Sequence, residues 1–136
     1  MRYLAIDYGA KRTGLAVCDA NERVASPLSV LEGQRSLVER IAQVVEAEAI
    51  ETVVVGWPLN MDGSEGPQAQ EVRAFAERMR KRVGVPVVFQ DERLSSFGAE
   101  EKLRETGLSR AKRRQRRDAL AAAEILRAFL EAREGR

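Results

Sequence analysis

Histidine is absent from this chain of 136 residues, and cysteine occurs once, at Cys18. The lack of histidine excludes His-based catalytic triads, His general bases and His-containing zinc sites. Any metal ion must therefore be bound by oxygen ligands, as hard ions such as Mg²⁺ or Mn²⁺ are. A single cysteine cannot form an internal disulfide. This fits a reducing compartment, so we expect a cytoplasmic protein.

Long apolar runs and aromatic residues are also scarce. No apolar stretch approaches the roughly 20 residues of a membrane span, and the N-terminus lacks a signal-peptide pattern, so we expect no membrane partner. Aromatic residues make up 5% of the chain, and base stacking should not dominate any binding to nucleic acid. The length suits a single domain, residues 1–136, with one core.

The net charge is only +2, but it is distributed unevenly. Residues 1–108 carry 14 Lys/Arg against 17 Asp/Glu, whereas residues 109–136 carry 9 against 4. A polyanion would bind this basic end, although a solvated helix start can look similar. The densest part places six cations in eight residues: Arg110, Lys112, Arg113, Arg114, Arg116 and Arg117.

The hydrophobic pattern predicts an α/β fold. Three strands separated by turns come first and suggest an antiparallel meander. Strands then alternate with helices, which implies right-handed crossovers and parallel pairing. We therefore predict a mixed five-stranded sheet flanked by helices. The expected strands are residues 2–6, 13–18, 24–31, 52–55 and 85–90. The expected helices start at a capping box at Ser36, at Pro67, at Ser95 or Ser96, and around Asp118. The helix that starts at Ser95 or Ser96 should end near Gly107.

An acid ends the first predicted strand and is followed at once by a glycine turn with two cations. Asp7 precedes Gly9, and Lys11 and Arg12 follow. Gly9 lets the backbone turn sharply and lets a phosphate-bearing partner approach, and the two cations can bind its anionic groups. Asp-x-Gly is also ordinary turn chemistry. The choice between these interpretations depends on whether other acids reach the same place.

Three further acids could meet Asp7. Asp91 and Glu92 end the last predicted strand, and parallel strands present their carboxyl ends at one edge of a sheet. Asp118 shares a helix face with apolar residues, so it should point toward the sheet. We choose Glu92 over Asp91 because a strand alternates its faces, although the sequence leaves this open. As alternatives, Asp118 could simply favour a helix start and the Asp91–Glu92 pair could be a solvated loop.

Convergence of these acids would favour a metal site. Two carboxylates about 4 Å apart repel by roughly 4 kcal/mol at an effective dielectric constant of 20. A bound divalent cation or an added proton removes that repulsion. One or two Mg²⁺ or Mn²⁺ ions, held by Asp7, Glu92 and Asp118, would activate water and neutralise charge on phosphorus. The predicted chemistry is phosphodiester hydrolysis.

Four ordered motifs span nearly the whole chain. They are Asp7-x-Gly9-x-x-Arg12-x-Gly14-x-Ala16, the segment Gly56–Gly63, the segment Asp91–Ser95, and Asp118-x-x-Ala121-Ala122-x-x-Ile125-Leu126. Together they resemble the YqgF/RuvX family, which is similar to Holliday junction resolvases of the ribonuclease H-like superfamily. Departures are Trp57, where a small aliphatic residue is more usual, Phe97-Gly98 after the serines, and the Arg-rich stretch.

The resemblance implies a bacterial cytoplasmic nuclease that processes the 5′ end of precursor 16S rRNA, or one that cuts branched DNA. The sequence leaves open whether the protein is a monomer or a homodimer. It also implies that Asp7, the Asp91–Glu92 pair and Asp118 form the acidic centre. Lys11, Arg12, Arg93 and the basic stretch are then the candidate substrate contacts. Two other classes stay open: a kinase or ATPase half with an Asp-x-Gly phosphate loop, and a nucleic-acid binder without catalysis.

Overall fold

The computed structural model describes residues 1–19, 21, 24–92 and 110–134, with side chains omitted for residues 110–118 and 134. Its centre is one five-stranded sheet in the order β3-β2-β1-β4-β5. The strands are β1 (Tyr3–Asp7), β2 (Arg12–Cys18), β3 (Ala25–Glu32), β4 (Thr52–Trp57) and β5 (Val87–Asp91).

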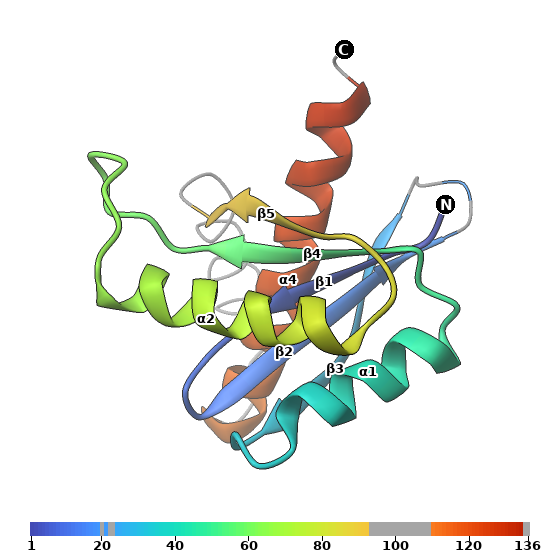
Figure 1. Cartoon of the computed structure of the whole chain (residues 1–136), viewed down its shortest axis with the longest axis horizontal. Helices are drawn as coiled ribbons and strands as arrows, with labels where there is room; N and C mark the ends of the chain where they lie inside the picture. The colour runs from blue at the N-terminus through green and yellow to red at the C-terminus, as the bar shows by residue number, and fades with distance from the viewer. Residues whose placement is uncertain (20, 22–23, 93–109, 135–136) are drawn as a thin grey trace.

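The sheet is mixed, as predicted. β2 pairs antiparallel with both β1 and β3, whereas β4 pairs parallel with both β1 and β5. The three parallel strands therefore end at the same edge of the sheet (Figure 1). We call this edge the carboxyl edge; the ends of β1, β4 and β5 at Asp7, Trp57 and Asp91 define it.

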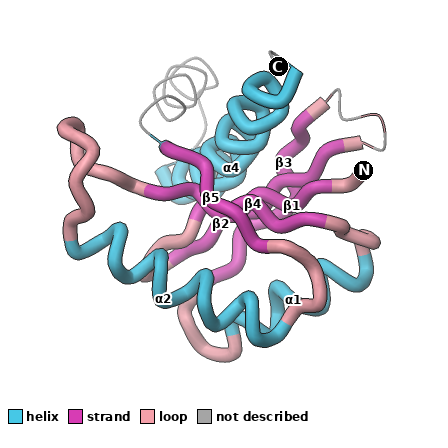
Figure 2. The backbone as a smooth tube through the Cα atoms, turned by 45° about the horizontal axis from the view of Figure 1, so that its top comes forward, coloured by secondary structure: helices cyan, strands magenta, loops and turns pink. Residues whose placement is uncertain are grey.

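Helices cover both faces of the sheet, and Figure 2 shows the layers. α1 (Leu37–Ala47) and α2 (Pro67–Arg82) lie on one face and contact each other. α4 (Arg110–Glu134) lies on the other and contacts all five strands. No helix in the described part of the chain is long and apolar enough to cross a membrane.

Helix starts were predicted with mixed success. Pro67 opens α2 as expected, because proline suits the first helical position. The capping box at Ser36 is wrong: Ser36 precedes α1, but its side chain makes no capping hydrogen bond. Its backbone is left-handed (φ 55°, ψ 28°), whereas a capping side chain needs an extended backbone at that position.

The last helix begins earlier than predicted. It starts at Arg110 rather than around Asp118, so Asp118 lies two turns inside it. Arginine, lysine, glutamine and alanine are all good helix formers, and no glycine or proline interrupts them, so the basic stretch is helical rather than a preceding loop. The helix predicted from Ser95 or Ser96 to Gly107 lies outside the described residues.

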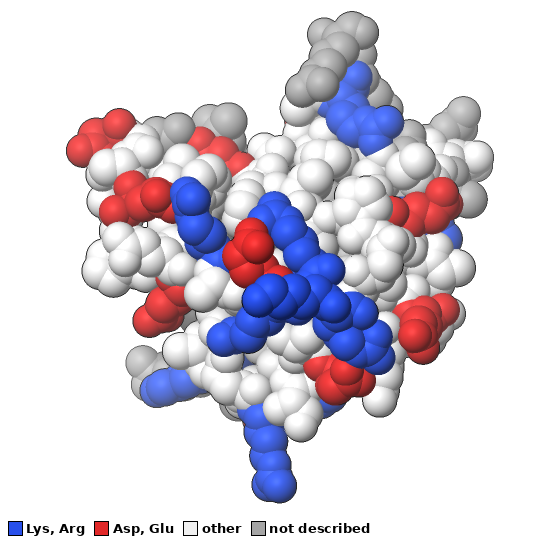
Figure 3. All heavy atoms as spheres, viewed as in Figure 1, with Lys and Arg blue, Asp and Glu red and all other residues white. Residues whose placement is uncertain are grey.

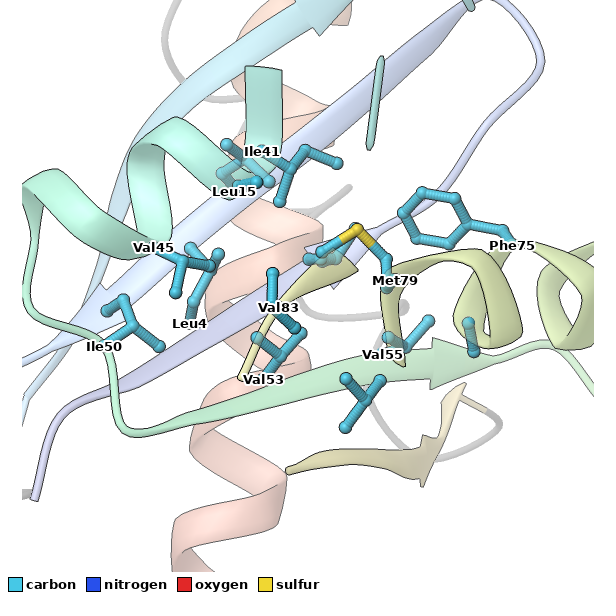
Figure 4. Packing of buried hydrophobic residues seen from close by; sticks show 14 of the residues in the cluster. Leu4, Leu15, Ile41, Val45, Ile50, Val53, Val55, Phe75, Met79 and Val83 are labelled. Carbon is cyan, nitrogen blue, oxygen red and sulfur yellow. The ribbon is translucent and has the colours of Figure 1, made fainter. Parts of the chain in front are cut away.

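The two faces of the sheet bury different side chains. Toward α1 and α2, large apolar residues interlock, among them Leu4, Ile41, Phe75 and Met79 (Figure 4). Toward α4, the buried cluster contains many small residues: Ala5, Ala16, Ala122 and Ala123. Small side chains let the axis of α4 approach the sheet closely.

Candidate active site

The alternation of β1 determines where Asp7 lies. Tyr3 and Ala5 belong to the cluster under α4, and Leu4 and Ile6 to the cluster under α1 and α2. Since side chains alternate along a strand, Asp7 belongs to the α4 side. It is half-buried at the carboxyl edge. The first strand therefore delivers an acid to the end of the α4 face.

The same alternation separates Asp91, the last residue of β5, from Glu92, which follows it. Val88 packs with the α4 cluster and Phe89 with the opposite one, where it stacks on Trp57 with ring centroids 4.9 Å apart. Asp91 then falls on the α1/α2 side and Glu92, the next residue, on the α4 side. Glu92, rather than Asp91, therefore lies on the same face as Asp7, and its role as a ligand stays a prediction.

Asp7 and Glu92 are brought into direct contact. A hydrogen bond joins their side chains. Two carboxyl groups can share such a bond only if one carries a proton, so they titrate as a pair. Burial raises the pKa of the Glu92 carboxyl above its ordinary value of 4.5; the hydrogen bond with Asp7 lowers this pKa, and the charge of Asp91 raises it further.

The path of α4 relates Asp118 to this pair. Phe129 meets Tyr3 edge to face near the start of β1, with ring centroids 5.2 Å apart, and Ile125 lies against Gly56 near the end of β4. The helix therefore runs toward the carboxyl edge in its N-terminal direction. By helical periodicity Asp118 shares the face of Ile125. Its side chain lies outside the described residues, so its contact with the pair stays a prediction.

The turn after Asp7 is held in a fixed shape. A Cβ at Gly9 would lie 2.4 Å from the carbonyl oxygen of Arg12, so only glycine fits there. The Gln34 amide donates to the Gly9 carbonyl oxygen (2.7 Å), and the Tyr8 hydroxyl donates to the Gln34 side-chain oxygen (2.9 Å). Lys11 is exposed on this turn, and Arg12 is half-buried.

The remaining predicted substrate contacts are only partly described. Six of them lie on the first turns of α4, where the structure describes the backbone alone, and Arg93 lies outside the described residues. The six are Arg110, Lys112, Arg113, Arg114, Arg116 and Arg117.

A second group of cations lies on the opposite face. Figure 3 shows Lys and Arg side chains gathered over α2, with acidic side chains among them. The last turn of α2 carries three of them: Arg80, Lys81 and Arg82. Arg80 pairs with Glu77 and Arg82 with Glu39, so these two are partly neutralised. Cations at a helix C-terminus also complement the helix dipole, and this group is explained without a ligand.

The donor set suits a hard divalent cation. Two carboxyl groups, Asp7 and Glu92, are held in contact, and such a pair needs a proton or a cation to be stable. Within the described side chains no group of three or more acids or cysteines lies close enough to hold a metal ion. Asp118, the predicted third ligand, is not among those side chains.

Sequence reasoning missed Gly56. A Cβ on this residue would collide with Glu92 and with Ile125, so its lack of a side chain shapes the site. A signal was present, because a glycine inside a strand often marks the close approach of another group. The sequence did not say which group.

The chain is similar to known proteins over nearly its whole length. A family model described as "RuvX: Holliday junction resolvase" matches residues 1–132. A protein of Anaeromyxobacter sp. (strain Fw109-5), named "Putative pre-16S rRNA nuclease", is 49% identical over 135 residues, 98% of each chain. One of Chloroflexus aurantiacus (strain ATCC 29366 / DSM 635 / J-10-fl) with the same name is 40% identical over 132 residues, 96% of this chain and 86% of that protein.

Solved structures show the fold. The T. thermophilus RuvC structure in complex with Holliday junction substrate aligns with a TM-score of 0.63 at 22% identity, covering 99% of this chain and 97% of that one. The fowlpox virus resolvase, solved with substrate Holliday junction DNA, aligns with a TM-score of 0.61 at 9% identity, covering 97% and 98%. The predicted ribonuclease H-like fold is confirmed.

Proposed function

Because the chain belongs to the RuvX family and is a nuclease, we propose that it hydrolyses phosphodiester bonds with a divalent cation and acts at the 5′ end of precursor 16S rRNA. The contact between Asp7 and Glu92 carries this proposal. Acids from two strands far apart in the sequence meet at the edge where open α/β sheets bind ligands. Curated relatives over the full chain length supply the substrate class.

Asp7, Glu92 and Asp118 would hold the cation, one Mg²⁺ or Mn²⁺ ion or two. A bound divalent cation lowers the pKa of water and neutralises charge that develops on the phosphoryl oxygens. Asp7 is the central ligand, since β1 is the middle strand of the sheet and its end faces α4. Asp91 lies on the α1/α2 side, and its negative charge favours the binding of a proton or a cation by the Glu92 carboxyl group.

The cations position the nucleic acid. Lys11 and Arg12 follow Asp7 on the fixed turn and are suited to hold a phosphate next to the one that reacts. The basic stretch at the start of α4 would supply further phosphate contacts, and Arg93 follows Glu92 directly in the sequence. Each phosphate that these residues neutralise should steepen the salt dependence of binding by about 0.7–0.9 log units. We place this activity in the cytoplasm, on a monomer or homodimer.

A second candidate substrate is a four-way DNA junction. The family description, "Holliday junction resolvase", favours it. Symmetric cutting of a junction needs two active sites related by a two-fold axis, and therefore a homodimer. The rRNA substrate makes no such demand. Oligomeric state on each nucleic acid thus separates the two candidates.

The test is cleavage of two labelled substrates, a precursor rRNA that contains the 16S 5′ leader and a four-way DNA junction. Each is incubated with Mg²⁺ or Mn²⁺ and with wild type or Asp7→Asn protein. We expect the wild type to cut the rRNA precursor and the variant to leave it intact. Equal cutting by both proteins would mean a contaminating nuclease and a wrong site. Binding without cleavage by both would favour a non-catalytic binder.

A further inference from the structure

Gly56 lies between Glu92 of the candidate active site and Ile125 of α4. It is the fifth residue of β4 and pairs in register with Gln90 of β5. The neighbours on β4 fix its side of the sheet: Val54 packs with the α4 cluster, so Gly56 also belongs to the α4 face. On that face it lies between Glu92 and Ile125.

A side chain at this position would collide on two sides. A Cβ on Gly56 would lie 2.5 Å from Oε1 and 2.9 Å from Cγ of Glu92, and 2.5 Å from Cδ1 of Ile125. Non-bonded carbon atoms prefer separations of about 3.5–4.0 Å, so both neighbours would have to move. Ile125 is held in the packed core, with 1% of its surface exposed, whereas Glu92 is only half-buried at the carboxyl edge.

The backbone gives no other reason for glycine here. Among the described residues the glycines with positive φ are Gly33 and Gly63, and Gly56 is not one of them. Its strand conformation is open to any residue with a side chain. The requirement for glycine is therefore one of space alone, and Glu92 uses that space.

We propose that Gly56 is a positioning residue: its missing side chain provides the space in which the Glu92 carboxyl group lies against Asp7. Replacing it would push Glu92 away from the edge and separate the two carboxyl groups. The consequence for catalysis rests on the proposed function. The geometric consequence does not, because it follows from the distances around Gly56.

Two variants separate this role from simple helix packing. Gly56→Ala introduces both collisions. Gly56→Ala/Ile125→Val removes the collision with Cδ1 of Ile125 and keeps the one with Glu92. Gly84→Ala is the matched control, because a Cβ on Gly84 would meet nothing within 4 Å. For each protein we would measure the melting temperature, the Mn²⁺ affinity by calorimetry, and the Asp7–Glu92 geometry by crystallography without metal.

The expected result is a loss of Mn²⁺ affinity of about 10–100-fold in Gly56→Ala, the usual size when a group that orients a metal ligand is changed. The double variant should recover the melting temperature but not the Mn²⁺ affinity, and its crystal structure should show the two carboxyl groups apart. Gly84→Ala should match wild type in all three measurements.

Two results would overturn the proposal. One is a Gly56→Ala protein that keeps the carboxyl groups in contact. The other is a double variant in which contact and affinity return together with stability, which would make Gly56 a helix-packing residue only. If wild type itself bound no Mn²⁺, the proposed metal-dependent function would fail, and the metal-free crystal structures would still decide the role of Gly56.

Discussion

The two faces of the sheet differ in the side chains that they bury and in what those side chains contribute. The face under α1 and α2 is filled with large side chains such as Ile41, Phe75 and Met79, which are fully buried. The face under α4 combines large side chains such as Tyr3 and Leu126 with several alanines, and it ends at the carboxyl edge in Asp7 and Glu92. Burial of large apolar side chains stabilises the fold most. The α1/α2 face thus contributes mainly to stability. On the α4 face, small side chains let α4 lie close to β1 and to the end of β5, which carry the acids.

The largest expected effect is on chemistry at the end of the α4 face. Asp7→Asn should reduce cleavage by roughly 10³-fold, because it removes about 4 kcal/mol of transition-state stabilisation. It should not lower the melting temperature, because it relieves repulsion with Glu92. Steady-state cleavage and a thermal melt check both. Glu71→Gln, an exposed position on α2, is the matched control. If the two variants were equally active, Asp7 would have no catalytic role.

On the opposite face the pattern should reverse. Met79→Ala should lower the free energy of unfolding by about 2–5 kcal/mol, because it leaves a cavity in the packed core. Cleavage per folded molecule should stay at the wild-type level, since Met79 lies near the end of α2, where Arg80 donates to the Val87 carbonyl at the start of β5, opposite the carboxyl edge. Urea denaturation and single-turnover cleavage give the two numbers. A loss of cleavage under conditions in which Met79→Ala is fully folded would show that packing under α1 and α2 affects the active site.

An intermediate effect should come from enlarging a small residue under α4. Ala122→Leu overpacks a fully buried position and should cost about 1–3 kcal/mol of stability. Unlike Met79→Ala it should also reduce cleavage, because it pushes α4 away from the sheet and Asp118 with it. Urea denaturation and single-turnover cleavage again give both numbers. If cleavage stayed normal, the small residues would not be needed to hold α4 close to the sheet for catalysis.

Much of this fold could be predicted from the sequence because the strong signals are local. A β-branched run marked β4, and the 3.6-residue period of Val72, Phe75 and Met79 marked α2. The start of α4 could not be found in the same way. Its first turns carry no apolar stripe, only good helix formers, so propensity alone decided the boundary.

For the candidate site, the sequence predicted which strand ends meet but not which side chains meet there. Parallel strands share a carboxyl edge, so a meeting of Asp7 with the Asp91–Glu92 pair followed from topology. Which acid of that pair turns inward depends on the phase of β5, and the sequence left this phase open. The role of Gly56 depends on contacts among residues 56, 92 and 125, which no local pattern encodes.

The buried acid itself should make the α4 face sensitive to pH. Burial raises the pKa of Glu92, so the folded state holds this proton to a higher pH than the unfolded state does. Stability should therefore fall as pH rises from the ordinary value of 4.5 through the raised pKa of Glu92.

Glu92→Gln should melt higher than wild type near pH 8 and like wild type near pH 4, as measured without divalent ions. Saturating Mg²⁺ should narrow the difference near pH 8, since only the wild type gains a ligand carboxylate. A constant difference across the pH range would mean that ionisation of Glu92 does not strain the fold.

The smallest effect should come from an exposed acid on the other face. Arg82 donates to Glu39 across the α1–α2 contact, one bond measuring 3.1 Å between Nη2 and Oε2, and this hydrogen bond lowers the pKa of Glu39. A lowered pKa contributes stability above the ordinary range of the acid and loses it as pH falls through the lowered value. Because the pair is fully exposed, solvent and salt screen it, and Glu39→Gln should be hard to distinguish from wild type in a thermal melt. The comparison with Glu92→Gln is the informative one, because the two substitutions are chemically identical and act on pKa values shifted in opposite directions. Glu92→Gln should raise the melting temperature near pH 8, whereas Glu39→Gln should leave it unchanged, so an equal shift in both variants would mean that burial at the carboxyl edge does not set the behaviour of Glu92.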